Sequence, residues 1–183
     1  MKAQIEAIHR RIETTATAAG RQPASVRLVA VSKTVPADRV REAIKNGINL
    51  LGENYIQEAR EKIEALREFP VAWHFIGHLQ RNKAKYAVRL FDLIHSVDSI
   101  KLARELDRQA CKIGKIQDIL IQVNTGKEAS KSGVYVEEAL TLVREAGHMS
   151  HIAIKGLMTL PPYFNAPDRV RPYFQALREL RYR

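Results

Sequence analysis

Short apolar segments alternate with amphipathic segments along the whole of this 183-residue chain. The apolar segments predict six strands, at residues 26–31, 48–51, 71–76, 91–97, 116–123 and 152–157. Each is followed by a stretch with apolar residues at helical spacing, and no hairpin turn sequence joins two of the strands. Because parallel strands need a crossover connection, this alternation predicts a parallel α/β fold.

Two parallel architectures fit that pattern, an open doubly wound sheet and a closed barrel. No G-x-G-x-x-G or G-x-x-x-x-G-K-[ST] turn follows any strand, so the usual nucleotide fingerprints of the open sheet are missing. We therefore predict a (β/α)8 TIM barrel that stops after about six of its eight strand–helix units. The expected organisation is a single, partial domain over residues 1–183, with a leading helix at about residues 2–19.

Charge is the first compositional feature that bears on function. The chain has 30 Lys and Arg against 20 Asp and Glu, for a formal net charge of +10. Such a balance can attract nucleic acid or a phosphorylated small molecule. The basic residues are spread along the chain and form no known nucleic-acid module, so we expect no specific nucleic-acid partner. Titration against random RNA at two salt concentrations would test that alternative.

The hydropathy pattern and the cysteine count bear on whether this is a membrane, secreted or disulfide-bonded protein. No apolar run approaches the roughly 20 residues that span a bilayer, and the first residues, MKAQIEAIHRR, are charged where a signal peptide is apolar. We expect a cytoplasmic protein with no membrane partner. Cys111 is the only cysteine, so neither an internal disulfide nor a cysteine-built metal site can form.

Lys33 closes the first predicted strand, VRLVAVSK at residues 26–33. Ligands of α/β folds gather at the carboxyl ends of parallel strands, which makes this lysine a candidate binding residue. A lysine at a strand end can equally extend its stem along the protein and keep its ammonium in water. The spacing alone leaves both interpretations open.

Other polar residues are expected at the same ends of the remaining strands. They are Glu53, Asn54, His74, His78, His95, Ser96, Asn124 and Thr159, with Met158 beside the last. His74 and His78 are four residues apart, but on a strand and its loop rather than on one helix, and no acidic third ligand accompanies them. We therefore expect no metal site.

Five motifs select among these candidates. They are AVSKT at 30–34, LGENYIQE at 51–58, WHFIGHLQRNK at 73–83, QVNTGKEASKSG at 122–133 and GLMTLPP at 156–162. Together and in this order they resemble the pyridoxal-phosphate homeostasis proteins, the YggS/PROSC family. That family is similar to the barrel domain of alanine racemase, and the likeness covers nearly the whole chain.

The resemblance implies a binding site for pyridoxal 5′-phosphate. By its place in AVSKT, Lys33 would bear this cofactor as an imine, and a partly desolvated lysine at an apolar strand end can have its pKa lowered enough to attack an aldehyde. Asn54 would lie by the cofactor ring, Met158 would floor the pocket, and His74 is a further pocket candidate. Lys131 matches a family lysine near the mouth of the site.

The implied function is to hold pyridoxal 5′-phosphate without catalysis in intracellular cofactor homeostasis, with apo-enzymes as candidate recipients. The alternative is a fold-type III enzyme, an amino-acid racemase or decarboxylase. Those enzymes resemble this fold with an added β domain that supplies an opposing acid–base group, and 183 residues leave no room for it. Family members also continue into a phosphate-binding segment and a later strand with an arginine. Both are expected to lie outside this sequence.

Overall fold

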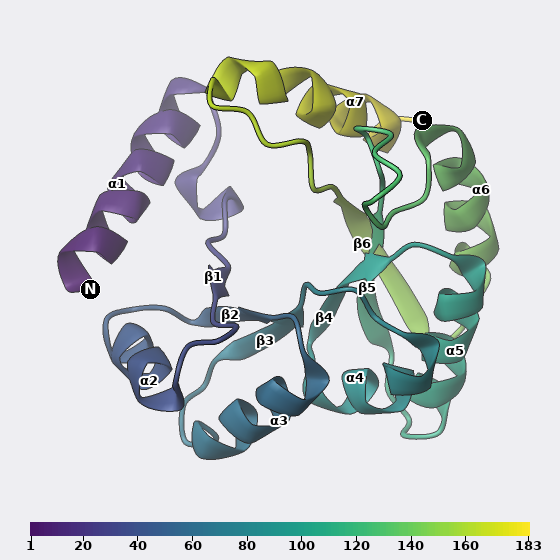
Figure 1. Cartoon of the computed structure of the whole chain (residues 1–183), viewed down its shortest axis with the longest axis horizontal. Helices are drawn as coiled ribbons and strands as arrows, with labels where there is room; N and C mark the ends of the chain where they lie inside the picture. Colours follow the sequence, from purple (N-terminus) through teal and green to yellow (C-terminus); the bar gives the residue numbers. More distant parts are fainter. The chain divides into compact units, whose positions relative to one another are not determined.

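A computed structural model describes residues 1–183. The chain divides into two compact units, Met1–His74 and Phe75–Arg183, and each is described by itself. Six strands alternate with helices in chain order, as the sequence predicts (Figure 1).

The first unit contains three strands and three α-helices. Its elements are α1 (Lys2–Ala18), a 3₁₀ turn η1 (Pro23–Ser25), β1 (Ala30–Val31), α2 (Ala37–Lys45), β2 (Leu50–Glu53), α3 (Ile56–Ala65) and β3 (Ala72–Phe75). The strands β1, β2 and β3 are neighbours in that order. β1 and β2 run parallel, with Ala30 opposite Leu51 and Val31 opposite Gly52.

The central strand β2 carries the core of this unit. All four of its residues are buried, as the near-continuous apolar sequence of a parallel strand predicts. From α3, Ala59 is buried, Leu66 directly after it is buried as well, and Val40 of α2 is 2% exposed. Glu53 is the exception to the apolar character of this strand, because its side chain is acidic and yet 0% exposed.

The first strand is shorter and more exposed than the sequence predicts. We expected a strand over residues 26–31 covered on both faces, yet only Ala30 and Val31 form the strand, and Val31 is 51% exposed. β1 stands at the end of the strand order and pairs with β2 on one side. An edge strand has one side without a paired strand, which is consistent with the exposure of Val31.

The second unit continues the same alternation. Its elements are η2 (Arg81–Lys83), α4 (Ala84–Leu90), β4 (Leu93–Val97), α5 (Ile100–Cys111), β5 (Gln117–Gln122), α6 (Val136–Gly147), β6 (Ile152–Met158), η3 (Pro167–Val170) and α7 (Arg171–Arg181). β4, β5 and β6 are parallel neighbours. Their residues Ile94, Ile119 and Ile121 are fully buried.

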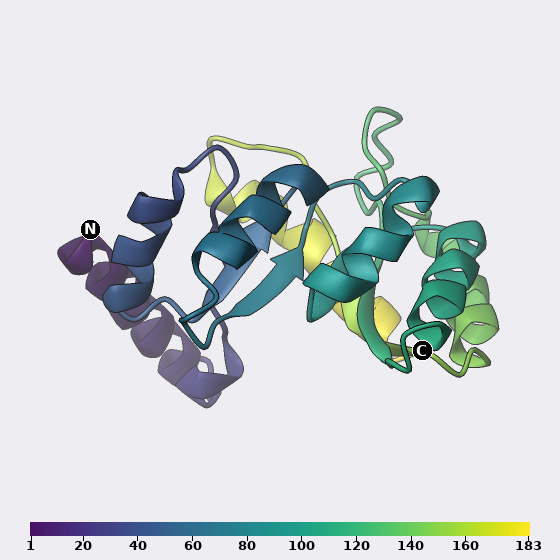
Figure 2. The same cartoon turned by 90° about the horizontal axis from the view of Figure 1, so that it is seen from below.

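A local capping residue marks the start of one helix of this unit. Ser99 caps α5 by accepting a hydrogen bond from the Leu102 backbone N–H at 3.4 Å, as expected for a serine before an apolar stripe. α4 packs beside α5, and α5 beside α6 (Figure 2). Cys111 is exposed at the end of α5. None of the helices has both the length and the apolar character required to cross a bilayer.

Candidate functional site

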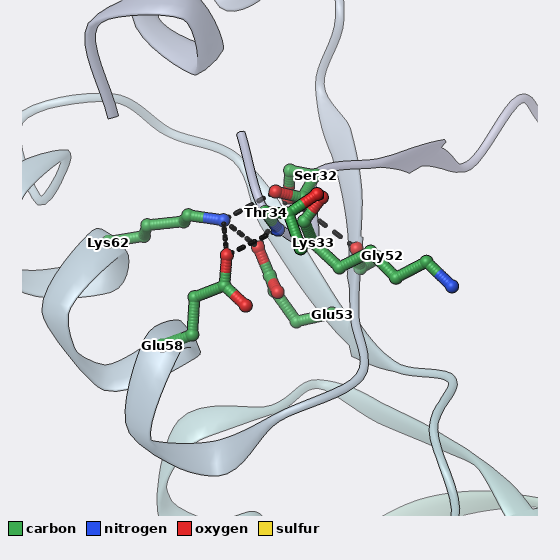
Figure 3. Close-up of polar contacts among 7 residues, drawn as sticks. All are labelled: Ser32, Lys33, Thr34, Gly52, Glu53, Glu58 and Lys62. Atoms are coloured by element: carbon green, nitrogen blue, oxygen red, sulfur yellow. Dashed lines mark hydrogen bonds and ion pairs between the residues drawn. The ribbon is translucent and has the colours of Figure 1, made fainter. Parts of the chain in front are cut away.

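Lys33 lies two residues beyond the end of β1, at the carboxyl edge of the first unit's strands. Its side chain is exposed, and its ammonium makes no hydrogen bond or ion pair. Figure 3 shows the side chain extending away from the polar groups around its backbone. The partial desolvation suggested for this lysine from the sequence is therefore not found.

Asn54 directly follows β2, the strand that pairs with β1. Val31 is opposite Gly52, and the pairing continues through the Ser32 backbone N–H, which donates to the Gly52 carbonyl oxygen at 3.0 Å. Lys33 and Asn54 both lie beyond these paired residues, Lys33 in a turn. The amide oxygen Oδ1 of Asn54 is buried and accepts no hydrogen bond. A free amine and an unpaired acceptor thus lie just beyond the carboxyl ends of two adjacent strands.

A buried ion cluster supports the backbone beneath Lys33. We call Ser32, Glu53, Glu58 and Lys62 the Lys62 cluster (Figure 3). The ammonium of Lys62 donates to Oε1 of Glu53 at 2.8 Å, to Oε1 of Glu58 at 2.7 Å and to the carbonyl oxygen of Ser32. Lys62 is 5% exposed, and its three donors are matched by three acceptors.

The cluster reaches both residues that flank Lys33. On one side, the Ser32 hydroxyl donates to Oε1 of Glu53 at 2.7 Å. On the other, the backbone N–H of Thr34 donates to Oε1 of Glu58 at 2.5 Å. Thr34 has φ of 61°, a left-handed conformation that is unusual for a β-branched residue. The backbone from residue 32 to residue 34 is therefore held by side chains of β2 and α3.

Pairing with Lys62 also fixes the charge of Glu58. The hydrogen bond from Lys62 holds the pKa of this carboxyl below its usual value of 4.5, the Thr34 backbone N–H adds to the effect, and burial partly opposes it. The single lysine is shared between the two carboxylates.

The remaining predicted residues are spread over both units. His74 is buried in β3 of the first unit, 5% exposed. Met158 is the last residue of β6 in the second unit, where its carbonyl oxygen accepts from the Val123 N–H at 2.8 Å. Lys131 donates to the Pro161 carbonyl oxygen at 2.9 Å and pairs with Glu128 at 2.8 Å. The roles of His74 and Met158 in one pocket stay predictions.

The sequence analysis did not single out Glu58 or Lys62. The signal was present, because the two are spaced i, i+4 on one helix and Lys62 falls between the buried positions Ala59 and Leu66. A lysine on the apolar stripe of a helix has to be paired if it is buried. No group of three or more His, Cys, Asp or Glu side chains is arranged to hold a metal ion.

Comparison with known proteins identifies the class. The family model for the alanine racemase N-terminal domain matches residues 4–182. The fold is thus of the alanine racemase N-terminal type, which confirms the predicted fold class. Within this class the chain belongs to the family of pyridoxal phosphate homeostasis proteins, as the following relatives show.

The pyridoxal phosphate homeostasis protein of Aquifex aeolicus is 44% identical over 93% of this chain and 75% of its own length. The protein of that name from Pseudomonas aeruginosa is 41% identical over 93% of this chain and 74% of its own. Among solved structures, PipY of Synechococcus elongatus with pyridoxal phosphate bound is 35% identical, with a TM-score of 0.80 over 93% of this chain and 80% of PipY.

Proposed function

We propose that this chain binds pyridoxal 5′-phosphate through Lys33 and holds it, without catalysis, as part of intracellular cofactor homeostasis. The observation that carries the proposal is the unpaired amine of Lys33 just beyond the end of β1, together with the unpaired amide oxygen of Asn54 just beyond the end of the adjacent strand β2. The bound cofactor in the related PipY structure and the names of the curated relatives support it.

The residues present suit this cofactor. Pyridoxal phosphate supplies an aldehyde, and its condensation with an unprotonated lysine amine forms one carbon–nitrogen double bond and releases one water. Lys33 is the lysine of this unit that stands free at a strand end, whereas Lys62 has all three donors engaged. Asn54 Oδ1 can only accept, so it suits a hydroxyl or a protonated ring nitrogen. We propose His74 and Met158 as further residues that contact the cofactor.

The residues around Lys33 favour storage of the cofactor over catalytic turnover of an amino-acid substrate. Racemisation or decarboxylation needs a second group that carries a proton to or from the substrate. In the Lys62 cluster, Glu58 and Glu53 both pair with Lys62 through Oε1. Oε2 of Glu53 accepts no hydrogen bond, but it is buried. The group would therefore be stored as a reversible adduct and released to apo-enzymes, and we place this activity in the cytoplasm.

Covalent trapping tests the proposal. Purified protein is mixed with pyridoxal 5′-phosphate, reduced with borohydride, digested and mapped by mass spectrometry. The label is expected on Lys33, and the Lys33→Arg variant should lose the visible absorption of the adduct while remaining folded. A label that falls mainly on Lys131, or that scatters over surface lysines, would overturn the assignment.

A further inference from the structure

We infer that Glu58 and Lys62 are positioning residues for Lys33: they hold the backbone on both sides of it, so that the amine is presented at the strand ends in one direction. The inference rests on the proposed function of Lys33. Its structural basis is the Lys62 cluster, in which α3 reaches across to the segment that follows β1.

Ser32 is fixed at three atoms on the strand side of Lys33. Its N–H donates to the Gly52 carbonyl oxygen at 3.0 Å, and its hydroxyl donates to Glu53 at 2.7 Å. Its carbonyl oxygen accepts from the ammonium of Lys62. That carbonyl belongs to the peptide that joins residues 32 and 33, so Lys62 orients the peptide plane directly before Lys33.

Thr34 is fixed on the other side by Glu58. The peptide between residues 33 and 34 presents its N–H to the Glu58 carboxylate at 2.5 Å, a charge-assisted bond. Thr34 is held at φ of 61°, and a conformation of this kind persists only where surrounding contacts impose it. The bond to Glu58 is such a contact. Both peptide planes next to Lys33 are therefore set by α3.

Presentation of the amine follows from this arrangement. With both flanking peptides fixed, the direction in which the Lys33 side chain leaves the backbone is fixed too, and only its own side-chain torsions remain free. Holding a reacting group in place lowers the entropic cost of the covalent step. Contacts of the cofactor ring and phosphate do not depend on this direction. Loss of the hydrogen bonds that fix these two peptides should thus weaken covalent attachment of the cofactor to Lys33 more than its non-covalent binding.

Glu58 is the position at which to test the inference, because it is less buried than Lys62 or Glu53, at 26% side-chain exposure. Glu58→Ala removes the acceptor of the Thr34 N–H and leaves the Lys62–Glu53 pair in place. Glu58→Gln keeps an acceptor oxygen and serves as the conservative rescue. Glu61→Ala is the matched control, since it removes an exposed glutamate from the same helix and changes the net charge equally.

Three measurements on the full chain separate positioning from folding. The first is affinity for pyridoxal 5′-phosphate with adduct absorbance. The second is affinity for pyridoxine 5′-phosphate, which has no aldehyde. The third is hydrogen exchange at the Thr34 amide.

For Glu58→Ala we expect about tenfold weaker pyridoxal 5′-phosphate binding, from the loss of one charge-assisted hydrogen bond. Pyridoxine 5′-phosphate affinity should stay within about twofold, because its contacts avoid the covalent step. Thr34 exchange should be at least about tenfold faster.

The controls define the opposing results. Glu61→Ala should match the parent in all three measurements, and Glu58→Gln should recover most of the loss. Unchanged Thr34 exchange in Glu58→Ala, or faster exchange with unchanged adduct formation, would overturn the inference. Equal loss for both ligands would overturn it too, because it would show a structural role only. If the parent chain itself forms no adduct at Lys33, the proposed function and this role of Glu58 both fall, while Thr34 exchange still reports whether the backbone is held.

Discussion

The ammonium of Lys62 lies 2.8 Å from Oε1 of Glu53, and the side chains are only 7% and 0% exposed. Removing two charges from water costs free energy. The attraction between the charges offsets that cost only where additional hydrogen bonds are made to them. Here Ser32 and Glu58 supply those bonds. The buried pair is therefore supported by a connected cluster, and removing Lys62 takes away the ammonium that both carboxylates share.

Lys62→Met should destabilise the first unit strongly. The substitution leaves the carboxyl group of Glu53 fully buried without its ammonium partner. Breaking a buried ion pair in this way lowers the free energy of unfolding by about 3 to 5 kcal/mol. Urea unfolding followed by circular dichroism measures the free energy of unfolding. Lys45→Met is the control, because Lys45 is an exposed lysine at the end of α2, and it should change that free energy by no more than about 0.5 kcal/mol. Equal effects of the two substitutions would contradict the role given to the cluster.

The contribution of Glu58 to stability should depend on pH in one direction. Its pKa in the folded state lies below the usual value of 4.5, chiefly because Lys62 donates to it. A carboxyl with a lowered pKa stabilises the folded state above its unfolded pKa, and this stabilisation is lost as the pH falls through the folded pKa. The parent chain should thus exceed Glu58→Gln in stability by the most near neutral pH. The difference should shrink below about pH 4.5, as chemical denaturation at a series of pH values would show. A difference that grows on acidification would be the opposite result.

Gly133→Ala should disrupt the loop that carries Lys131. Gly133 has φ of 123°, and an added Cβ would lie 2.8 Å from the backbone nitrogen of Asn124. That nitrogen donates to the Val134 carbonyl oxygen at 2.9 Å, so the pairing of this loop with the end of β5 would have to move. We expect a loss of about 1 to 3 kcal/mol in the free energy of unfolding, measured by urea denaturation.

Gly147→Ala is the matched glycine control for that loop substitution. Nothing lies within 4 Å of the position that an alanine methyl would take, and Gly147 ends α6 without a positive φ. Alanine should be neutral or stabilise by up to about 1 kcal/mol there. A loss at Gly147 as large as that at Gly133 would show that close approach to Asn124 is not the cause.

Turnover of amino acids should be absent. We expect racemase and decarboxylase rates with added pyridoxal 5′-phosphate no higher than those of Lys33→Arg prepared in parallel, because the carboxylates beside Lys33 are engaged with Lys62. Chiral chromatography of alanine and assay of released carbon dioxide would measure this. Activity that follows the purified chain and disappears in Lys33→Arg would favour the enzyme alternative.

Local signals predicted most of the fold. Six strands alternating with helices followed from the periodicity of the apolar residues. The position of Lys33 at a strand end followed from the same pattern. Such features are determined by residues within a few positions of one another, so the sequence alone carries them.

The tertiary structure decided which charges are buried and which residues touch. Val31 is exposed on a strand that pairs on one side only, and a strand's place in the sheet is not a property of its own apolar sequence. Lys62 is buried because the fold brings Glu53 and the Ser32 carbonyl oxygen, 9 and 30 residues away, to its ammonium. Desolvation of a charge is tolerated only where partners meet it in space, and neither composition nor periodicity records that meeting.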